Sequence, residues 1–495
     1  MNAWWWLERV PVYPVALTMA IVLALGVSSG SRPADVVPLA AVLALCLAGL
    51  IAACSALTRR PRIVGALATL LTVATLLGRD LSTVELGLVA LLSLVLAAAL
   101  LRLPAEPLRI ATAGLNVMGG LLLVFAATST VRWQLALWRG DRGVAELPLP
   151  ALGPASDTPP ILHILLDGYG DPQWLQAHFG CGGALVPLLE DRGFTVVPGA
   201  RSNHAKTLLS TAAMLQMAPI DTWVPPGPNA GPLTAALRHN RVERMLTARG
   251  YRTEQVPSEF EPVRLAGTVH RPRPAAGLFD LTLLGISATS AVSRALGLPA
   301  LRAVHALHMR QQRFALDQIA RPLPGSTFRF VHVLAPHPPF VVEPSGVYRP
   351  DQSHHTIQDG SDWMTDGRDA AAYRQGYCAK LRWLTPRLIE PLDAQLAAHP
   401  DTVVVIHGDH GPGSALDWNA GGDVAERYGA LVAVRAPAAV RERLYAGMTL
   451  VNVYPVVFEG LFAAAVPRAP DTLYWSMSDA PLAFREITSY NEAAP

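Results

Sequence analysis

Two acidic residues in this chain follow runs of apolar residues, and one of them has a histidine beside it. The segment VVVIHGDHGPGS, residues 403–414, places Asp409 and His410 after an apolar run, and ILHILLD, residues 161–167, ends in Asp167. Charged groups are costly to bury unless another group pairs with them. Two carboxylates and an imidazole suit Zn²⁺ or Mn²⁺, and Mg²⁺ is a further candidate. We therefore predict one divalent metal ion at these residues.

Each of these residues taken alone also has an ordinary explanation. An Asp after a strand commonly caps the next helix, and a histidine such as His410 can bond a backbone carbonyl. The joint occurrence of all three residues favours the metal site.

A hydroxyl group that precedes a helical pattern is the candidate nucleophile. The segment SNHAKTLLSTAAMLQM, residues 202–217, contains this arrangement. At a helix N-terminus the dipole and a nearby metal ion together lower the pKa of a hydroxyl. We predict Thr207 as nucleophile and fourth metal ligand, with Lys206 beside it as a substrate-binding residue. Ser210 is the alternative nucleophile, and an N-cap without chemistry is the alternative role of Thr207.

A second candidate histidine follows another expected strand. In VLAPHPPF, residues 333–340, prolines on both sides of His337 hold the backbone stiff. We predict that His337 contacts a phosphate oxygen or protonates a leaving group. Asn419 lies close after the metal motif and is predicted, on proximity alone, to contact substrate.

These residues need a sheet that brings the ends of strands together. Helical patterns that end at Gly193 and Gly250 are each followed by a strand pattern. Continuous apolar strands that alternate with such helices indicate a mostly parallel α/β sheet with helices on both faces. In such a sheet ligands bind beyond the carboxyl ends of the strands, where Asp167 and Asp409 are expected. The apolar strand patterns are residues 161–167, 194–199, 328–334, 402–408 and 430–436.

The chain as a whole is more apolar than a purely soluble protein of its size. Its 495 residues are 51% hydrophobic and only 16% charged. Each of five apolar runs before residue 132 is near the length that a helix needs to cross a bilayer, although the third and fourth are short. We predict five transmembrane helices, and a buried helical core or a signal peptide is the alternative. The runs are residues 12–28, 36–57, 63–78, 86–101 and 110–131.

The loops between these runs predict an orientation. Arginines gather in alternate loops, so the positive-inside rule places the N-terminus in the cytoplasm. An odd number of spans then places the rest of the chain in the periplasm or outside the cell. We expect a transmembrane domain at residues 1–131, a juxtamembrane segment and linker at 132–160, and a catalytic domain at 161–495. The arginines on the cytoplasmic side are Arg9, Arg59, Arg60, Arg62, Arg102 and Arg109.

Charge and cysteine content exclude some classes of protein. A net charge of +2 without a basic stripe argues against nucleic acid as a partner. The four cysteines are too few for a disulfide framework. Cys181 and Cys378 are the only pair outside the expected membrane spans, and whether they bond is left open. The polar segment of residues 348–369 is too long for a simple connection and is either a functional loop or mobile.

Taken together, the motifs resemble those of the alkaline phosphatase superfamily. They are LLDGYG, the Thr of AKT, HVLAPHPPF and GDHG, behind a group of membrane helices. The most similar branch is the membrane-anchored, sulfatase-like one with lipoteichoic acid synthases and lipid A phosphoethanolamine transferases, and the resemblance covers roughly residues 160–488. It implies that Asp167, Thr207, Asp409 and His410 hold a metal ion, that Thr207 is the nucleophile, and that His337 contacts the substrate phosphate.

Two departures from the family pattern narrow this reading. Cys181 is followed by GGAL, so the motif that yields formylglycine in true sulfatases is missing. Gly168 replaces the second Asp of the usual sulfatase pair, which favours a single metal ion.

The resemblance implies a membrane-embedded phosphotransferase of the inner membrane. It would move a phosphoethanolamine or phosphoglycerol headgroup from a phospholipid donor to an envelope glycan or lipid, through a phospho-threonine intermediate. Two alternatives remain: a metal-dependent phosphodiesterase or phosphatase of the same family, and an envelope component that binds glycans without turnover.

Overall fold

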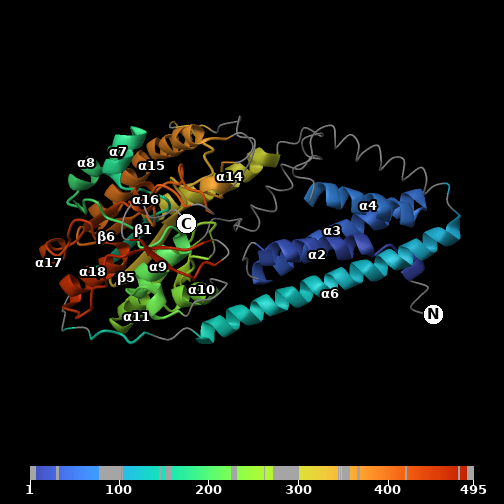
Figure 1. Ribbon diagram of the computed structural model, residues 1–495, viewed down its shortest axis with the longest axis horizontal. Coiled ribbons are helices and arrows are strands. Elements are labelled where there is room, and N and C mark those ends of the chain that lie inside the picture. Colours follow the sequence, from blue (N-terminus) through green and yellow to red (C-terminus); the bar gives the residue numbers. More distant parts are fainter. Residues whose placement is uncertain are drawn as a thin grey trace. The chain divides into compact units, whose positions relative to one another are not determined.

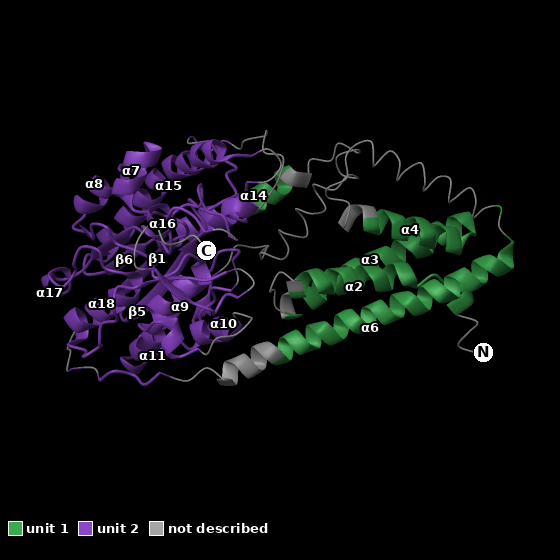
Figure 2. Ribbon diagram, viewed as in Figure 1, with its two compact units in different colours: residues 1–138, 276–307, 353–355 green, residues 139–275, 308–352, 356–495 purple. Residues whose placement is uncertain are grey.

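The computed structural model divides the chain into two compact units (Figure 2). Unit 1 comprises residues 1–138, 276–307 and 353–355, and unit 2 comprises residues 139–275, 308–352 and 356–495. The residues that the structure describes are 7–28, 33–76, 102, 104–143, 147–151, 153, 158–224, 231–260, 262–270, 300–343, 345, 347, 357–364, 368–418, 421–477 and 480–487.

Unit 1 is built from apolar helices. Pro33 and Pro61 open two of them, and proline suits the first helical position because the N–H it lacks has no partner there. Four of the five predicted spans are helical, and the predicted span at residues 86–101 lies outside the described residues. The helices are α2 (Tyr13–Ser28), α3 (Pro33–Thr58), α4 (Pro61–Leu76) and α6 (Ala105–Gly143).

Two of the described helices are long and apolar enough to cross a membrane. They are Val36–Thr58 within α3 and Ala105–Leu135 within α6. The apolar parts of α2 and α4, Tyr13–Val27 and Pro61–Val73, are shorter. The number of five spans therefore stays a prediction.

Unit 2 contains a seven-stranded, mostly parallel sheet. The strand order is β2-β7-β6-β1-β5-β3-β4. β1 is parallel to its neighbours β5 and β6, and β3 is parallel to β4 and β5, whereas β7 is antiparallel to β2 and β6. The strands are β1 (Ile161–Leu166), β2 (Thr195–Val196), β3 (Arg252–Val256), β4 (Thr268–Val269), β5 (Thr327–Val333), β6 (Val403–His407) and β7 (Val432–Arg435). The predicted fold class of a mostly parallel α/β sheet is confirmed.

Helices cover both faces of this sheet (Figure 1). Successive side chains of a strand point to opposite faces, so Ile161 and Leu165 of β1 enter one core and Leu162, Ile164 and Leu166 enter the other. The first core is closed by α9 (Thr207–Gln216), α10 (Gly231–Arg238), α11 (Arg241–Ala248) and α18 (Val453–Phe462). The second is closed by α7 (Pro172–Phe179), α8 (Leu185–Glu190) and α15 (Ala370–Ala398).

A disulfide links two distant parts of unit 2. Cys181, after α7, is bonded to Cys378 of α15, at a sequence separation of 197 residues. The sequence had left this bond open. Since disulfides persist in oxidising compartments, the bond agrees with an extracytoplasmic location for unit 2.

Candidate metal centre

The carboxyl ends of two central strands bring the acidic residues together. Asp167 directly follows β1, and Asp409 and His410 follow β6. The two strands are parallel neighbours with Leu165 opposite His407, so they end side by side. All three side chains at this end are buried. The order of the strands thus brings the predicted ligands together at the carboxyl ends of the central strands.

Glycines allow the two strand ends to approach closely. Gly168 has a φ of +76°, which side chains with a Cβ rarely adopt, and its N–H donates to Asp409 Oδ1 at 2.9 Å. A Cβ on Gly408 would lie only 1.9 Å from the Tyr169 carbonyl oxygen. Gly408 therefore has no room for a side chain, and the positive φ of Gly168 favours glycine over an acidic residue directly after Asp167.

The side chains of Asp167, His337 and His410 form a compact cluster. Asp167 Oδ1 lies 4.0 Å from His337 Nε2 and 3.9 Å from His410 Nε2, and all three atoms lie within 4.8 Å of one another. His337 reaches the cluster because it follows β5, the other neighbour of β1, and its N–H donates to the Asp167 carbonyl at 3.0 Å. Asp409 Oδ2 is 3.3 Å from His410 Nε2. The sequence assigned His337 to the substrate, and the structure places its imidazole in the same cluster as Asp167 and His410.

Two carboxylate oxygens in this cluster have no hydrogen-bond donor. Among the described residues, Asp167 Oδ1 and Asp409 Oδ2 are buried without a partner. The other oxygen of each carboxylate is bonded, since Asp167 Oδ2 accepts from His332 Nε2 at 2.8 Å and Asp409 Oδ1 accepts from Gly168. Buried anionic oxygens without donors are costly unless a cation meets them. The donor set therefore fits one divalent ion.

The two histidines present their Nε2 atoms to the cluster. His410 Nδ1 lies 2.8 Å from the Gly411 carbonyl oxygen, and His337 Nδ1 lies 3.0 Å from the Pro338 carbonyl oxygen. A carbonyl only accepts, so each Nδ1 is the protonated nitrogen and Nε2 carries the lone pair. In this tautomer His410 Nε2 can bind a metal ion and His337 Nε2 can take up a proton.

The electrostatics reflect an excess of buried negative charge. Burial, and then the Asp409 carboxylate, raise the pKa of Asp167 well above its usual value. Burial also acts to raise the pKa of Asp409, but His410, the Gly168 amide and the Thr207 hydroxyl hold it below its usual value. Burial and then Arg427 lower the pKa of His410 to about 4, so its imidazole is neutral at pH 7. A neutral imidazole is the form that ligates metals.

Thr207 is the hydroxyl that the fold brings to this cluster. It is the first residue of α9, and its Oγ1 lies 3.2 Å from His410 Nε2. Ser210, the alternative nucleophile, accepts a hydrogen bond from Ser202 Oγ at 2.9 Å. The geometry therefore favours Thr207 over Ser210.

Of the two predicted substrate-binding residues outside the cluster, the structure describes only Lys206. The Lys206 ammonium donates to the Met477 carbonyl at 3.2 Å and lies 5.3 Å from the centre of the Trp418 ring. Lys206 therefore points toward the segment that contains Met477. Asn419 lies outside the described residues.

Asp359 and Arg427 are site residues that sequence reasoning missed. Asp359 Oδ2 lies 3.8 Å from His337 Nε2 and is paired with Arg427 Nη1. Arg427, on α16 (Val424–Tyr428), also places Nη2 3.3 Å from His410 Nε2. Although burial opposes it, Arg427 and then His337 hold the pKa of Asp359 well below its usual range. Asp359 lies in the long polar segment whose length signalled a functional loop, and Arg427 had no comparable signal.

Two tyrosines of α15 hold the backbone around the cluster. Tyr377 OH donates to the Gly168 carbonyl at 2.8 Å and accepts from the Gly170 N–H at 3.2 Å. Tyr373 OH donates to Asp359 Oδ1 at 2.5 Å. Both hydroxyls are buried, and they fix the turn after β1 and the loop that carries Asp359.

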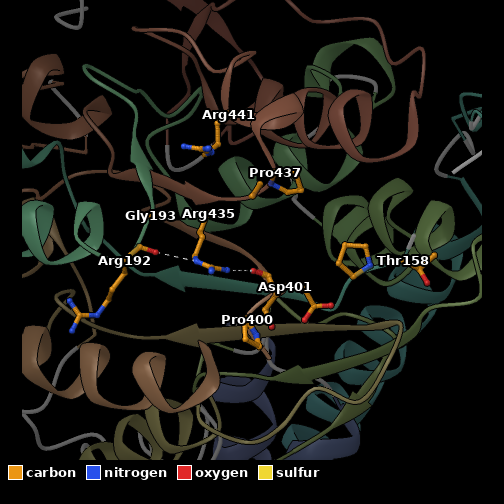
Figure 3. Close-up of a pocket in the computed structure, with 11 residues that line it drawn as sticks. Thr158, Arg192, Gly193, Pro400, Asp401, Arg435, Pro437 and Arg441 are labelled. Atoms are coloured by element: carbon orange, nitrogen blue, oxygen red, sulfur yellow. Dashed lines mark hydrogen bonds between the residues drawn. The ribbon is translucent and has the colours of Figure 1, made fainter. Parts of the chain in front are cut away.

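A separate hollow lies at the opposite ends of the strands (Figure 3). It has a volume of about 750 Å³ and is lined by Asp401 and Thr402, which precede β6, and by Arg435 at the end of β7. Arg435 donates to the carbonyls of Arg192 at 3.1 Å and Thr402 at 2.9 Å. Thr402 precedes β6 and Asp409 follows it, so the hollow and the candidate metal centre lie at opposite ends of that strand.

Comparisons with known proteins give similarity in structure only. No family model matches the chain, and no curated protein matches it. The integral membrane lipooligosaccharide phosphoethanolamine transferase A from Neisseria meningitidis has 10% identity and a TM-score of 0.39, over 83% of this chain and 89% of that chain. The phosphonate monoester hydrolase of Agrobacterium radiobacter has 14% identity and a TM-score of 0.40, over 64% of this chain and 80% of that chain.

A third similar structure was solved with zinc. It is the C-terminal periplasmic domain of EcEptC from Escherichia coli, with 12% identity and a TM-score of 0.37, over 64% of this chain and 87% of that chain. Phosphoethanolamine transferases are thus among the solved structures similar to this chain.

Proposed function

We propose that the chain is a membrane-anchored, metal-dependent phosphotransferase. Asp167, Asp409, His410 and Thr207 would hold one Zn²⁺ or Mn²⁺ ion. The donor would be a phospholipid with a phosphoethanolamine or phosphoglycerol headgroup, and the acceptor an envelope glycan or lipid.

The buried carboxylate oxygens without donors carry this proposal. Asp167 Oδ1 and Asp409 Oδ2 are both buried and unpartnered among the described residues, beside a hydroxyl at the start of a helix. A structural role would be expected to satisfy these oxygens with N–H groups. An arrangement of carboxylates, imidazole and hydroxyl around one point suits a cation that activates the hydroxyl.

The chemistry follows from the positions of Thr207 and His337. A bound divalent ion would lower the pKa of the Thr207 hydroxyl and polarise the phosphoryl group. Thr207 Oγ1, as its alkoxide, forms a bond to phosphorus while the bond from phosphorus to the lipid oxygen breaks. His337 Nε2, in its protonated form, gives a proton to the leaving oxygen, so that diacylglycerol is released.

The second step restores the enzyme. The acceptor hydroxyl gives its proton to His337 Nε2, and its oxygen forms a bond to phosphorus as the Thr207 Oγ1 bond breaks. The headgroup phosphate is then on the acceptor, and Thr207 returns as the alkoxide. Over the two steps His337 gives up one proton and regains one, and the headgroup phosphate passes from the donor to the acceptor.

Arg427 supplies positive charge beside this reaction. Its Nη1 pairs with Asp359, while Nη2 faces His410 Nε2 at 3.3 Å. With His410 Nε2 as a metal ligand, Arg427 Nη2 would be available to a phosphoryl oxygen. A guanidinium in a buried site stabilises charge that develops on such oxygens.

Labelled donor lipid tests the proposal directly. The full chain in detergent with Zn²⁺ is incubated with phosphatidylethanolamine or phosphatidylglycerol, and mass spectrometry measures diacylglycerol and the mass of the Thr207 peptide. We expect diacylglycerol release and a headgroup phosphate on Thr207, both abolished by Thr207→Ala. Thr385→Ala, on α15, is the matched control and should keep full activity.

The same assay separates the alternatives. Diacylglycerol release with free headgroup phosphate, whether or not an acceptor glycan is added, would indicate a hydrolase. Release of diacylglycerol by Thr207→Ala at the wild-type rate would rule out the threonine mechanism. A chain that binds no Zn²⁺ or Mn²⁺ by elemental analysis would favour a binding component.

A further inference from the structure

A lysine lies fully buried beneath the loop that carries His337. Lys380 is on α15, and its side chain is not exposed to solvent. Its ammonium donates to the carbonyl of Leu334 at 2.8 Å and to that of Pro339 at 3.3 Å, and it also bonds the carbonyl of His337. Three acceptors from one six-residue stretch thus converge on a single cation.

These carbonyls belong to the loop that carries His337, whose imidazole lies in the cluster with Asp167 and His410. The loop of residues 334–339 contains three prolines, whose nitrogens cannot donate, so its backbone has few N–H groups with which to fix itself. The His337 N–H donates to Asp167, and the His337 carbonyl accepts from Lys380. The backbone of His337 is therefore held between the strand end and the lysine.

A buried acidic residue balances the charge of Lys380. His308, on α14 (Ala300–Asp317), has Nε2 3.5 Å from the Lys380 ammonium and Nδ1 3.0 Å from Glu259 Oε1. Gln312 donates to Glu259 Oε2 at 2.9 Å. Glu259 is itself buried; burial lowers the pKa of Lys380 to about 7 and raises that of Glu259 to about 7, so the two groups form a buried pair bridged by His308.

The same network reaches the metal cluster from a second direction. Ser258, next to Glu259, has Oγ 3.0 Å from His332 Nδ1, and His332 Nε2 donates to Asp167 Oδ2. The polar groups beneath the site therefore connect Asp167 at one end with the loop of His337 at the other. Burying a lysine in such a place is costly, so an apolar side chain would serve if packing were the only requirement.

We propose that Lys380 is a positioning residue for the reaction: its ammonium fixes the loop of residues 334–339 and so holds the His337 imidazole at the metal cluster. This inference rests on the proposed function, in which His337 moves a proton. Lys380 acts through the backbone of the loop and touches neither the ion nor the substrate.

A double-mutant cycle tests the inference. The full chain in detergent with Zn²⁺ is assayed for diacylglycerol release from phosphatidylethanolamine or phosphatidylglycerol, whose alkoxide leaving group needs a proton, for wild type, Lys380→Met, His337→Ala and the double variant. A displacement of about 1 Å costs about 100-fold in rate, so we expect kcat to fall by about that factor in Lys380→Met with little change in KM. His337→Ala should lose a similar factor, and the double variant should lose no more than His337→Ala alone.

Controls separate this result from unfolding and from failure of the proposed function. Arg382→Met, an exposed position on the same helix, should keep wild-type kcat. If Lys380→Met does not fold, Lys380→Gln replaces it; its amide has only two N–H groups for three carbonyls, so we expect about tenfold loss of kcat. Multiplicative losses in the double variant, or unchanged kcat in the folded Lys380 variant, would overturn the inference. An inactive wild type that binds no Zn²⁺ would refute the proposed function instead.

Discussion

Asp167→Asn should have opposite effects on the stability of the protein with and without metal. The substitution keeps the shape of the side chain, and the Asn oxygen can still accept from His332 Nε2, which bonds Asp167 Oδ2 at 2.8 Å. It removes a carboxylate that is 1% exposed and whose Oδ1 has no donor among the described residues. The apo variant therefore no longer buries beside Asp409 a carboxyl group whose burial raises its pKa well above the usual value.

Two opposing contributions set the change in the free energy of unfolding of the apo variant. Burying the Asp167 carboxyl group, as an anion or by raising its pKa, costs up to several kcal/mol, whereas the bond from His332 becomes weaker by about 1 kcal/mol when its acceptor is an amide. We expect the apo variant to be more stable than apo wild type by about 1–3 kcal/mol. For wild type, Zn²⁺ at 100 times its dissociation constant should add about 2.7 kcal/mol, and the variant should gain far less.

Thermal unfolding of the full chain in detergent, followed by tryptophan fluorescence, measures both effects. Each protein is heated with a chelator and then with Zn²⁺. Asp393→Asn is the matched control, because Asp393 is half exposed and pairs with Arg192 on the surface, and it should leave the metal response unchanged. An equal gain from Zn²⁺ in Asp167→Asn and wild type would refute the assignment of Asp167 as a ligand.

Three further predictions concern residues around the site. His204 is buried between aromatic rings, and burial lowers its pKa to about 3, so the unfolded chain takes up a proton below pH 6.5 that the folded chain does not. Stability is thus lost as the pH falls, and between pH 7.5 and 5 His204→Phe should lose about 2 kcal/mol less than wild type in urea unfolding. Arg427→Met should lower the free energy of unfolding by about 3–5 kcal/mol because Asp359 stays buried and unpaired, and adding Asp359→Asn should restore most of it; additive losses in the double variant would contradict this. Replacing Cys181 and Cys378 together by Ser should lower the free energy of unfolding by about 3–5 kcal/mol. If the variant and wild type unfold at the same urea concentration under both oxidising and reducing conditions, the bond is not formed.

The sequence by itself determined the sheet and the chemical types at its edge. Continuous apolar runs before Asp167 and Asp409 are typical of buried strands in a mostly parallel sheet, because helices cover both faces of such a sheet. A residue that directly follows such a strand lies at the edge where ligands bind, so Asp167, Asp409 and His410 could be selected without coordinates. The helical pattern after Thr207 likewise fixed the place of its hydroxyl at a helix start.

Only the tertiary structure decided which further side chains meet these residues. Asp359 lies in a polar loop and Arg427 on a short helix, and nothing in their local sequence indicates that they pair or that they face His337 and His410. The same holds for Lys380, whose partners are backbone carbonyls more than 40 residues away in sequence. Local patterns report periodicity and burial, whereas contacts between distant segments depend on strand order and helix packing, which a single sequence does not encode locally.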